Sequence, residues 1–201
     1  MVYEFNNTKK LVLASASPRR IELLAQVGIA PDVVDPSAVT ENQEGNERPS
    51  EMVARLSQSK AVQVAKRHPF SFVLAADTAV AVGRRILGKP IDEEQAREFL
   101  VILSGRRHKV LTGVALVTPV GKTVKRIVTT SVKFKRLSPR DFDNYLELRE
   151  WHGKAGGYAI QGHAGAFACN ISGSYTNIVG LPLCETVNML LGNGFRYQNG
   201  K

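Results

Sequence analysis

The chain has 201 residues, 43% of them hydrophobic, and its 27 Lys and Arg against 18 Asp and Glu give a formal net charge of +9. This length and composition predict a single domain, residues 1–201, with an ordinary hydrophobic core. No stretch approaches the roughly 18 uninterrupted apolar residues of a membrane helix, and residues 1–10 contain no apolar signal segment. We therefore expect no membrane anchor and a cytoplasmic location, with Cys169 and Cys184 reduced and buried.

The excess positive charge favours a polyanionic partner, either nucleic acid or a multiply phosphorylated small molecule. Much of it falls on a predicted strand pair, at Lys122, Lys125, Arg126, Lys133, Lys135 and Arg136. Solvated strand faces explain these positions more simply than a nucleic-acid groove does, because the sequence lacks the regularly interleaved aromatics of a stacking platform.

Residues 10–28 contain the first structural unit. The apolar run 11–14 predicts a buried strand, and Ser17 and Pro18 are typical of a helix N-cap and first helical position. Ile21, Leu24 and Ala25 follow at helical spacing, and Gly28 closes the predicted helix.

This strand-loop-helix unit predicts an anion site. The N-terminus of a helix offers unsatisfied N–H groups and a positive dipole end, and Arg19 and Arg20 add two guanidinium forks that match phosphate oxygens. A capped helix with two solvated arginines is the alternative interpretation.

The next segment predicts a polar loop over residues 41–47 and a long helix capped by Ser50. Val53, Leu56 and Val64 mark the apolar face of this helix, and Lys60 falls on the same face. The Lys60 ammonium either reaches past the apolar surface to solvent or contacts phosphate directly.

The apolar run 72–76 ends in Asp77 and Thr78 before residues 79–82 resume an extended pattern. We read this as two strands joined by a polar tip. A loop with Lys89 follows, and then a helix capped by Asp92, with Gln95 three residues later.

Two alternating strands are predicted over 109–118 and 123–135, and Ser138 and Pro139 open another helix. Seven glycines lie between residues 153 and 180, and Pro182 begins a last helix with Val187, Leu190 and Leu191 inside. Because strands and helices alternate at both ends but a hairpin lies between, we predict an α/β fold with a mixed central sheet and helices on both faces.

Polar residues at predicted strand ends and loops form a candidate cleft: Ser15, Arg19, Arg20, Glu41, Lys60, Asp77, Lys89 and Gln161. Mixed cations and carboxylates suit a nucleoside triphosphate with a divalent ion, although each residue also has an ordinary structural explanation. The motifs GxxxxGK[ST] and GxGxxG are absent, so neither a P-loop nor a dinucleotide fold is supported.

The sequence also resembles a known family in six blocks that occur in the right order. They are LASASPRRIELLAQVGI (13–29), ARLSQSKA (54–61), AADT (75–78), GKP (88–90), LSGRRHKVLTGVAL (103–116) and KAGGYAIQGHAGAF with GSYTNIVGLPL (154–183). These blocks resemble the Maf proteins, which are nucleoside triphosphate pyrophosphatases. The resemblance implies a deep cleft in an α/β fold similar to inosine triphosphate pyrophosphatases.

The resemblance assigns roles to the candidate residues. It implies that Asp77 accepts the proton of the hydrolytic water and that Glu41 and Asp77 hold a divalent metal, Mg or Mn. It implies triphosphate binding by Ser15, Arg20, Lys60 and Lys89, and base preference at Arg19, Thr78 and Gln161.

Two positions depart from the family pattern, and one of them affects the metal assignment. Thr40 stands where the family often has Asp, and Arg107 where Thr is common. Glu44 and Glu47 therefore remain alternatives to Glu41 in the same loop.

The AIQG block around Gln161 resembles the branch of the family that acts on dTTP and UTP. A pyrophosphatase for 7-methyl-GTP or other modified nucleotides is the alternative enzyme. A nucleic-acid or division-protein binding module is the alternative of another class, supported by the basic charge. A homodimer is compatible with the sequence.

Overall fold

The computed structural model describes residues 9–197. The expected absence of a signal segment in residues 1–10 therefore falls mostly outside the described residues. The strands are β1 (Leu11–Leu13), β2 (Val33–Val34), β3 (Phe72–Val82), β4 (Arg85–Leu87), β5 (Arg107–Val117), β6 (Thr123–Phe134) and β7 (Ala168–Ser172). The α-helices are α1 (Pro18–Gln26), α2 (Pro49–Ala65), α3 (Glu93–Leu103), α4 (Pro139–Glu147), α5 (Tyr175–Val179) and α6 (Leu183–Gly192). Two 3₁₀ turns, η1 (Ala155–Gly157) and η2 (His163–Phe167), follow α4.

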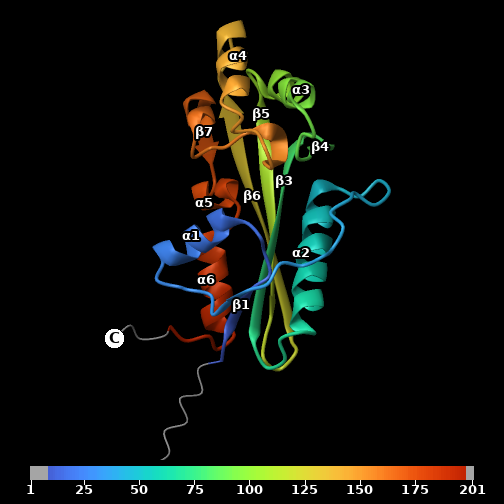
Figure 1. Cartoon of the computed structure of the whole chain (residues 1–201), viewed down its shortest axis with the longest axis vertical. Coiled ribbons are helices and arrows are strands. Elements are labelled where there is room, and N and C mark those ends of the chain that lie inside the picture. The colour runs from blue at the N-terminus through green and yellow to red at the C-terminus, as the bar shows by residue number, and fades with distance from the viewer. Residues whose placement is uncertain (1–8, 198–201) are drawn as a thin grey trace, which may run out of the picture.

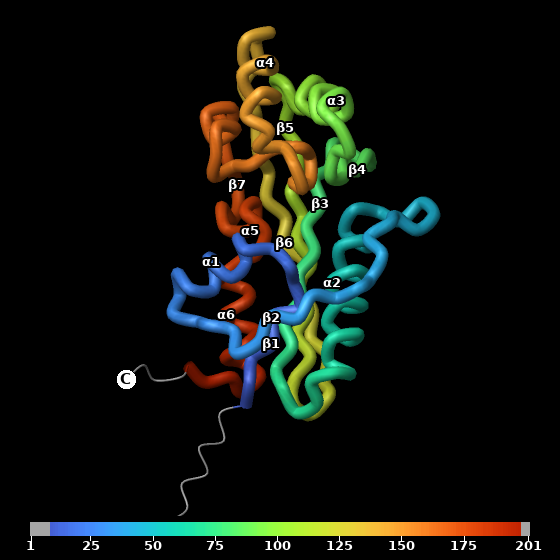
Figure 2. Tube along the Cα trace, viewed as in Figure 1, coloured from blue at the N-terminus to red at the C-terminus, as the bar shows by residue number. Residues whose placement is uncertain are grey.

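The strands form one sheet in the order β2-β1-β3-β5-β6-β7, with β4 paired to β3. β1 is parallel to β2 and β3, whereas the pairings of β3 with β4 and β5, of β5 with β6 and of β6 with β7 are antiparallel. Helix α2 covers one face and α1, α5 and α6 lie on the other side, with α3 and α4 at one end (Figures 1 and 2). The predicted mixed sheet with helices on both faces is confirmed.

The alternation of side chains along β3 separates the core into two layers. Val73 and Ala75 pack with apolar residues of α2, including Ala61 and Val64. Leu74 and Ala76 belong to the larger cluster on the opposite face, with residues of α1 and α6. Since successive residues of a strand point to opposite faces, Asp77 falls on the α2 face and Thr78 on the other.

The prediction of two strands around a polar tip at Asp77 is wrong. Strand β3 runs through Asp77 and Thr78, which pair with Gly113 and Thr112 of β5. The strand continues because β5 forms backbone hydrogen bonds with β3 at these positions. The side chains of Asp77 and Thr78 also have partners, Lys60 and Thr112.

Three smaller predictions are also wrong. Helix α2 begins at Pro49 after Arg48 in the N-cap position, so Ser50 is not its cap, and proline favours the first helical position. Both cysteines are free but exposed, because Cys169 lies on the edge strand β7 and Cys184 on an outer position of α6. Leu191 is 37% exposed, since the buried side of α6 is formed by Thr186, Met189 and Leu190.

Other local predictions are confirmed. The Asp92 side chain accepts a hydrogen bond from the Gln95 amide and caps α3, and the Ser138 side chain accepts from the Asp141 amide and caps α4. Within residues 9–197, no helix combines the length and apolar character needed to cross a membrane.

Candidate active site

A gap in the pairing of β3 positions the site. On one edge, β1 pairs with β3 only from Phe72 to Leu74, and β4 pairs with it only from Val80 to Val82. Among residues 9–197, no strand therefore lies beside residues 75–79 on that edge, where the chain turns from β1 into α1. Asp77 and Thr78 lie in this gap, and a cavity of about 580 Å³ opens against them.

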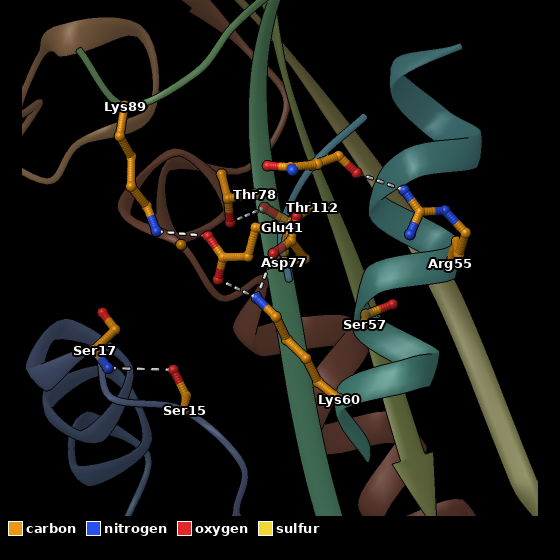
Figure 3. Close-up of polar contacts among 12 residues, drawn as sticks. Ser15, Ser17, Glu41, Arg55, Ser57, Lys60, Asp77, Thr78, Lys89 and Thr112 are labelled. Carbon is orange, nitrogen blue, oxygen red and sulfur yellow. Dashed lines mark hydrogen bonds and ion pairs between the residues drawn. The ribbon is translucent and has the colours of Figure 1, made fainter. Parts of the chain in front are cut away.

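On the α2 face of β3, Asp77 belongs to a chain of four alternating charges. The Lys60 Nζ atom lies 2.6 Å from Asp77 Oδ1 and 2.6 Å from Glu41 Oε1, and the Lys89 Nζ atom lies 2.6 Å from Glu41 Oε2. Figure 3 shows Lys60 reaching from α2 to both carboxylates, with Lys89 approaching Glu41 from the opposite side. The buried Lys60 therefore makes directed contacts, and of the two alternatives given for it above, the one in which it reaches past the apolar surface to solvent is wrong.

The close packing of α2 on the sheet brings Lys60 to Asp77. Gly113 pairs with Asp77 across β3 and β5, and a Cβ atom at Gly113 would lie 2.2 Å from the carbonyl oxygen of Val53 on α2. Only glycine permits this approach, so the sequence at Gly113 determines how near the helix carrying Lys60 comes to the strand.

The two carboxylates differ in their pKa values. Burial raises the pKa of Asp77 above its ordinary value, against the opposing effects of Lys60 and Arg20. Burial would also raise the pKa of Glu41, but hydrogen bonds from Lys60 and Lys89 together lower that pKa to about 2. Asp77 is therefore the carboxylate of the pair that is better suited to accept a proton.

On the opposite face of β3, Thr78 joins a hydrogen-bonded chain of mostly neutral partners. Its Oγ1 atom lies 2.9 Å from Thr112 Oγ1 and accepts a 3.5 Å contact from an Arg20 Nη atom. Arg20 also donates to Ser15 Oγ at 2.8 Å and to the carbonyl oxygen of Gly180 at 2.9 Å. Burial lowers the pKa of Arg20, and its hydrogen bonds are to neutral oxygen atoms.

Arg19 lies beside Arg20 at the N-terminus of α1. Its Nε atom donates to the carbonyl oxygen of Val179 at 3.3 Å. The predicted strand-loop-helix unit is confirmed here, although Ser17 makes no capping hydrogen bond through its side chain and Ser15 Oγ accepts from the Ser17 amide instead. Two guanidinium groups that form no ion pair with a carboxylate in the described part of the chain thus line one side of the cavity.

All the residues predicted for the site line this one cavity: Ser15, Arg19, Arg20, Glu41, Lys60, Asp77, Thr78, Lys89 and Gln161. Gln161 is exposed and makes no side-chain hydrogen bond within residues 9–197, so its amide is available to a molecule in the cavity. Apolar side chains complete the lining, among them Val80, Val110, Tyr158, Ile160 and Ile178.

Sequence reasoning missed Lys154, which also lines the cavity. Burial lowers the pKa of Lys154, and the positive charge of Arg19 lowers it further. The signal was present in the KAGGYAIQG block, whose first residue is Lys154, but a lone lysine before a glycine pair is not diagnostic of a site.

The structure separates Glu41 from the two other carboxylates of its loop. Only Glu41 of the three lines the cavity, whereas Glu44 and Glu47 pair with Arg55 of α2, which is not part of the lining. Within the described part of the chain, no group of three or more His, Cys, Asp or Glu side chains could hold a metal ion. The pair Glu41 and Asp77 fits a divalent cation that takes one or two protein carboxylates and completes its coordination with substrate phosphates.

The chain matches the Maf-like protein family over residues 10–192. It belongs to this family. The dTTP/UTP pyrophosphatase of Paramagnetospirillum magneticum is 56% identical over 185 residues, 92% of this chain and 97% of that protein. The dTTP/UTP pyrophosphatase of Caulobacter vibrioides is 55% identical over 186 residues, 92% of this chain and 96% of that protein.

A more distant likeness exists among solved structures. The match to the nucleoside-triphosphatase / dITP/XTP pyrophosphatase from Mycobacterium abscessus covers 64% of this Maf-like chain and 75% of that protein's chain. The sequence identity is 22% and the TM-score is 0.43.

Proposed function

We propose that this Maf-like protein hydrolyses nucleoside triphosphates to the monophosphate and pyrophosphate, with dTTP and UTP as preferred substrates. The observation that carries the proposal is the pairing, in one cavity, of a buried Asp77 bonded to Lys60 with an opposing wall that presents Arg19, Arg20 and the start of α1. The names of the two relatives support the choice of nucleotide.

The reaction proceeds by attack of water on the α-phosphorus. The new bond joins the water oxygen to this phosphorus, and the bond to the oxygen bridging the α- and β-phosphates breaks, so pyrophosphate leaves with the bonding electron pair. Asp77 accepts the proton of the water. Its raised pKa, caused by burial, suits a group that must be charged before attack and protonated after it.

The cations of the cavity orient the triphosphate. Ser15 lies in the loop after β1, Arg20 in the first turn of α1 and Lys89 in the loop after β4, so phosphate oxygens can be held from two sides while Asp77 acts between them. Fixing the reacting groups in line removes much of the entropic barrier, and cationic donors stabilise charge that develops on the phosphates.

Glu41 and Asp77 would hold a divalent metal, Mg or Mn, together with substrate phosphates. Such a cation neutralises phosphate charge and polarises the phosphoryl group. Lys60 keeps both carboxylates in place through its contacts with Glu41 and Asp77.

Base selection falls to the remaining part of the cavity. Gln161 carries a donor and an acceptor on one amide, which match the imide edge of uracil or thymine, where one N–H lies between two carbonyls. Apolar neighbours such as Val110 and Ile160 can contact the face of the ring.

A panel of nucleoside triphosphates tests the proposal. Pyrophosphate release from dTTP, UTP, CTP, GTP and 7-methyl-GTP is measured with Mg or Mn and again after chelation, with Asp77→Asn as the inactive control. We expect dTTP and UTP to be hydrolysed fastest and turnover to stop on chelation. Faster hydrolysis of 7-methyl-GTP would assign the alternative enzyme activity, and no turnover of any nucleotide would contradict the proposal.

A nucleic-acid binding module would behave differently in the same buffers. Its binding would persist after chelation and weaken steadily as salt is added. Residues 9–197 place carboxylates at the centre of the basic cavity, which disfavours a nucleic-acid backbone in the absence of a cation.

A further inference from the structure

Arg55, a residue outside the cavity, contacts the loop that carries Glu41 at several points. Its Nε atom lies 3.0 Å from Glu47 Oε2 and a second guanidinium nitrogen contacts Glu47 Oε1, which makes the pair bidentate. The same guanidinium donates to the carbonyl oxygen of Asn42 at 2.9 Å and lies 3.0 Å from Glu44 Oε1. One side chain of α2 thus binds three residues of the segment 42–47.

This loop has few other attachments to the body of the protein. Within residues 9–197, no backbone–backbone hydrogen bond joins residues 39–47 to a strand or helix. The loop bonds mainly to itself, through Glu44 and Glu47, and its charged contacts with the rest of the fold are those of Glu41 and of Arg55. Val39 adds an apolar contact at the start of the segment.

Helix α2 therefore holds the Glu41 loop at two places. Lys60 reaches the Glu41 carboxylate directly, and Arg55, one and a half turns earlier on the helix, holds the residues that follow Glu41 (Figure 3). Without the Arg55 contacts, Glu41 would depend on its two lysine partners alone, and both of those lysines are expected to contact phosphate when substrate binds.

The Arg55 contacts are stronger than an ordinary surface ion pair. Exposed pairs contribute little because water screens them and because ordering long side chains costs entropy. Here the Glu47 side chain is 12% exposed and the Arg55 side chain 27% exposed, and the bidentate geometry adds directional hydrogen bonds.

We propose that Arg55 is a positioning residue for the hydrolysis reaction: its guanidinium clamps residues 42–47 so that the Glu41 carboxylate stays at the catalytic cavity. The inference rests on the proposed function. It assigns Arg55 no contact with substrate, and its effect on turnover passes through Glu41.

A double-mutant cycle tests this dependence. We expect Arg55→Ala to lower kcat/KM for dTTP by about 10- to 100-fold, since a displacement of about 1 Å at a catalytic group can cost that much. In a Glu41→Gln background, Arg55→Ala should lower kcat/KM by less than about 2-fold, because the Glu41 carboxylate that Arg55 positions is already absent. Equal losses in both backgrounds would overturn the proposal, as would the absence of any loss from Arg55→Ala.

Three further variants separate the bidentate clamp from a simple effect of charge. Arg55→Lys keeps the positive charge but lacks the planar fork, so we expect only partial recovery of activity; full recovery would mean that charge alone matters. Glu47→Gln should lose more activity than Glu44→Gln, because the Glu44 side chain is 70% exposed and makes a single contact with Arg55. Equal effects of these two changes would contradict the bidentate clamp.

Arg97→Ala is the matched control. Arg97 forms a 2.6 Å ion pair with Asp143 between α3 and α4, away from the cavity lining, so its removal should leave kcat/KM unchanged. A loss as large as that of Arg55→Ala would show that removing any paired arginine lowers activity, and would overturn the assignment.

Hydrogen exchange tests the clamp independently of catalysis. The amides of Glu44 and Glu47 are hydrogen-bonded within the loop, and Arg55→Ala and Arg55→Lys should speed exchange in peptides spanning 41–48 while leaving β5 unchanged. Unaltered exchange in both variants would overturn the clamp. If the wild-type protein hydrolyses no nucleotide, the proposed function fails and the catalytic role of Arg55 fails with it, whereas the exchange result still reports whether Arg55 holds the loop.

Discussion

The two walls of the cavity both carry cationic side chains but balance their charges differently. On the α2 wall, two ammonium groups and two carboxylates form one chain of contacts, so Lys60, Lys89, Glu41 and Asp77 neutralise one another. On the α1 wall, the hydrogen bonds of Arg19 and Arg20 within residues 9–197 are to carbonyl and hydroxyl oxygens. The α1 wall therefore has positive charge left for an anion, and the α2 wall holds a protected carboxylate for chemistry.

This difference assigns separate tasks to the two walls. Changes at the carboxylates of the α2 wall should affect the rate of the chemical step, whereas changes at the arginines of the α1 wall should affect the binding of phosphate. The predictions below test this division, from the largest expected effect to the smallest.

Asp77→Asn should remove most activity, because the amide is nearly isosteric but cannot accept the proton of the attacking water. Loss of a positioned general base typically lowers the rate by about 10²- to 10⁴-fold. The loss should be measured as a fall in kcat for dTTP. Circular dichroism and the melting temperature should show that the Asp77→Asn protein is folded. A folded Asp77→Asn protein with substantial turnover would remove Asp77 from its role.

Arg20→Lys should weaken substrate binding in the α1 wall, because a lysine cannot reproduce the three contacts that the Arg20 guanidinium makes with Ser15, Thr78 and Gly180. The free energy of hydrogen bonds made by a charged group is large enough that their loss should lower kcat/KM by about 10- to 100-fold. Arg19→Lys is the matched variant and should lose less, since Arg19 makes one such contact. A larger effect from Arg19→Lys would contradict the assigned order.

Gln161→Glu should change base preference more than overall activity. The substitution removes the amide donor and places negative charge near the carbonyl oxygens of uracil or thymine, so hydrolysis of dTTP and UTP should fall by about 10-fold or more relative to GTP and 7-methyl-GTP. Values of kcat/KM for the four nucleotides measure this. An equal fall for all four would mean that Gln161 supports its loop and does not recognise the base.

The pH profile should report the contrast between the two carboxylates. Because burial raises the pKa of Asp77, kcat/KM should rise with pH as Asp77 loses its proton, with an acid midpoint above the ordinary aspartate value of 3.8. Glu41, with a pKa of about 2, stays charged across that range and should not contribute to the midpoint. A midpoint at or below 3.8 would contradict this assignment.

Much of the local structure could be predicted because its signals act over a few residues. The capping residues Asp92 and Ser138, the proline at the start of α1 and the alternating hairpin of β5 and β6 all have their partners nearby in the chain. The errors arose where distant segments decide the outcome: β5 supports β3 through Asp77, and the edge position of β7 exposes Cys169.

The residues of the cavity were also recognisable from the sequence, but their arrangement was not. Motif composition indicated the candidate side chains, yet it left Glu44 and Glu47 as alternatives to Glu41 and did not find Lys154 or Arg55. The structure separates the three carboxylates because α2 presents Lys60 to Glu41 and Arg55 to Glu44 and Glu47.

The sequence by itself determined the caps of α3 and α4, the paired strands β5 and β6 and the set of polar residues available for chemistry, since backbone propensity and capping depend on neighbours within a turn or a strand. Only the tertiary structure decided which charges meet. The Lys60–Asp77, Lys60–Glu41 and Lys89–Glu41 contacts join residues 17, 19 and 48 positions apart. Their distances depend on where β1 leaves β3 and on how closely Gly113 lets α2 approach, which are properties of the packed sheet.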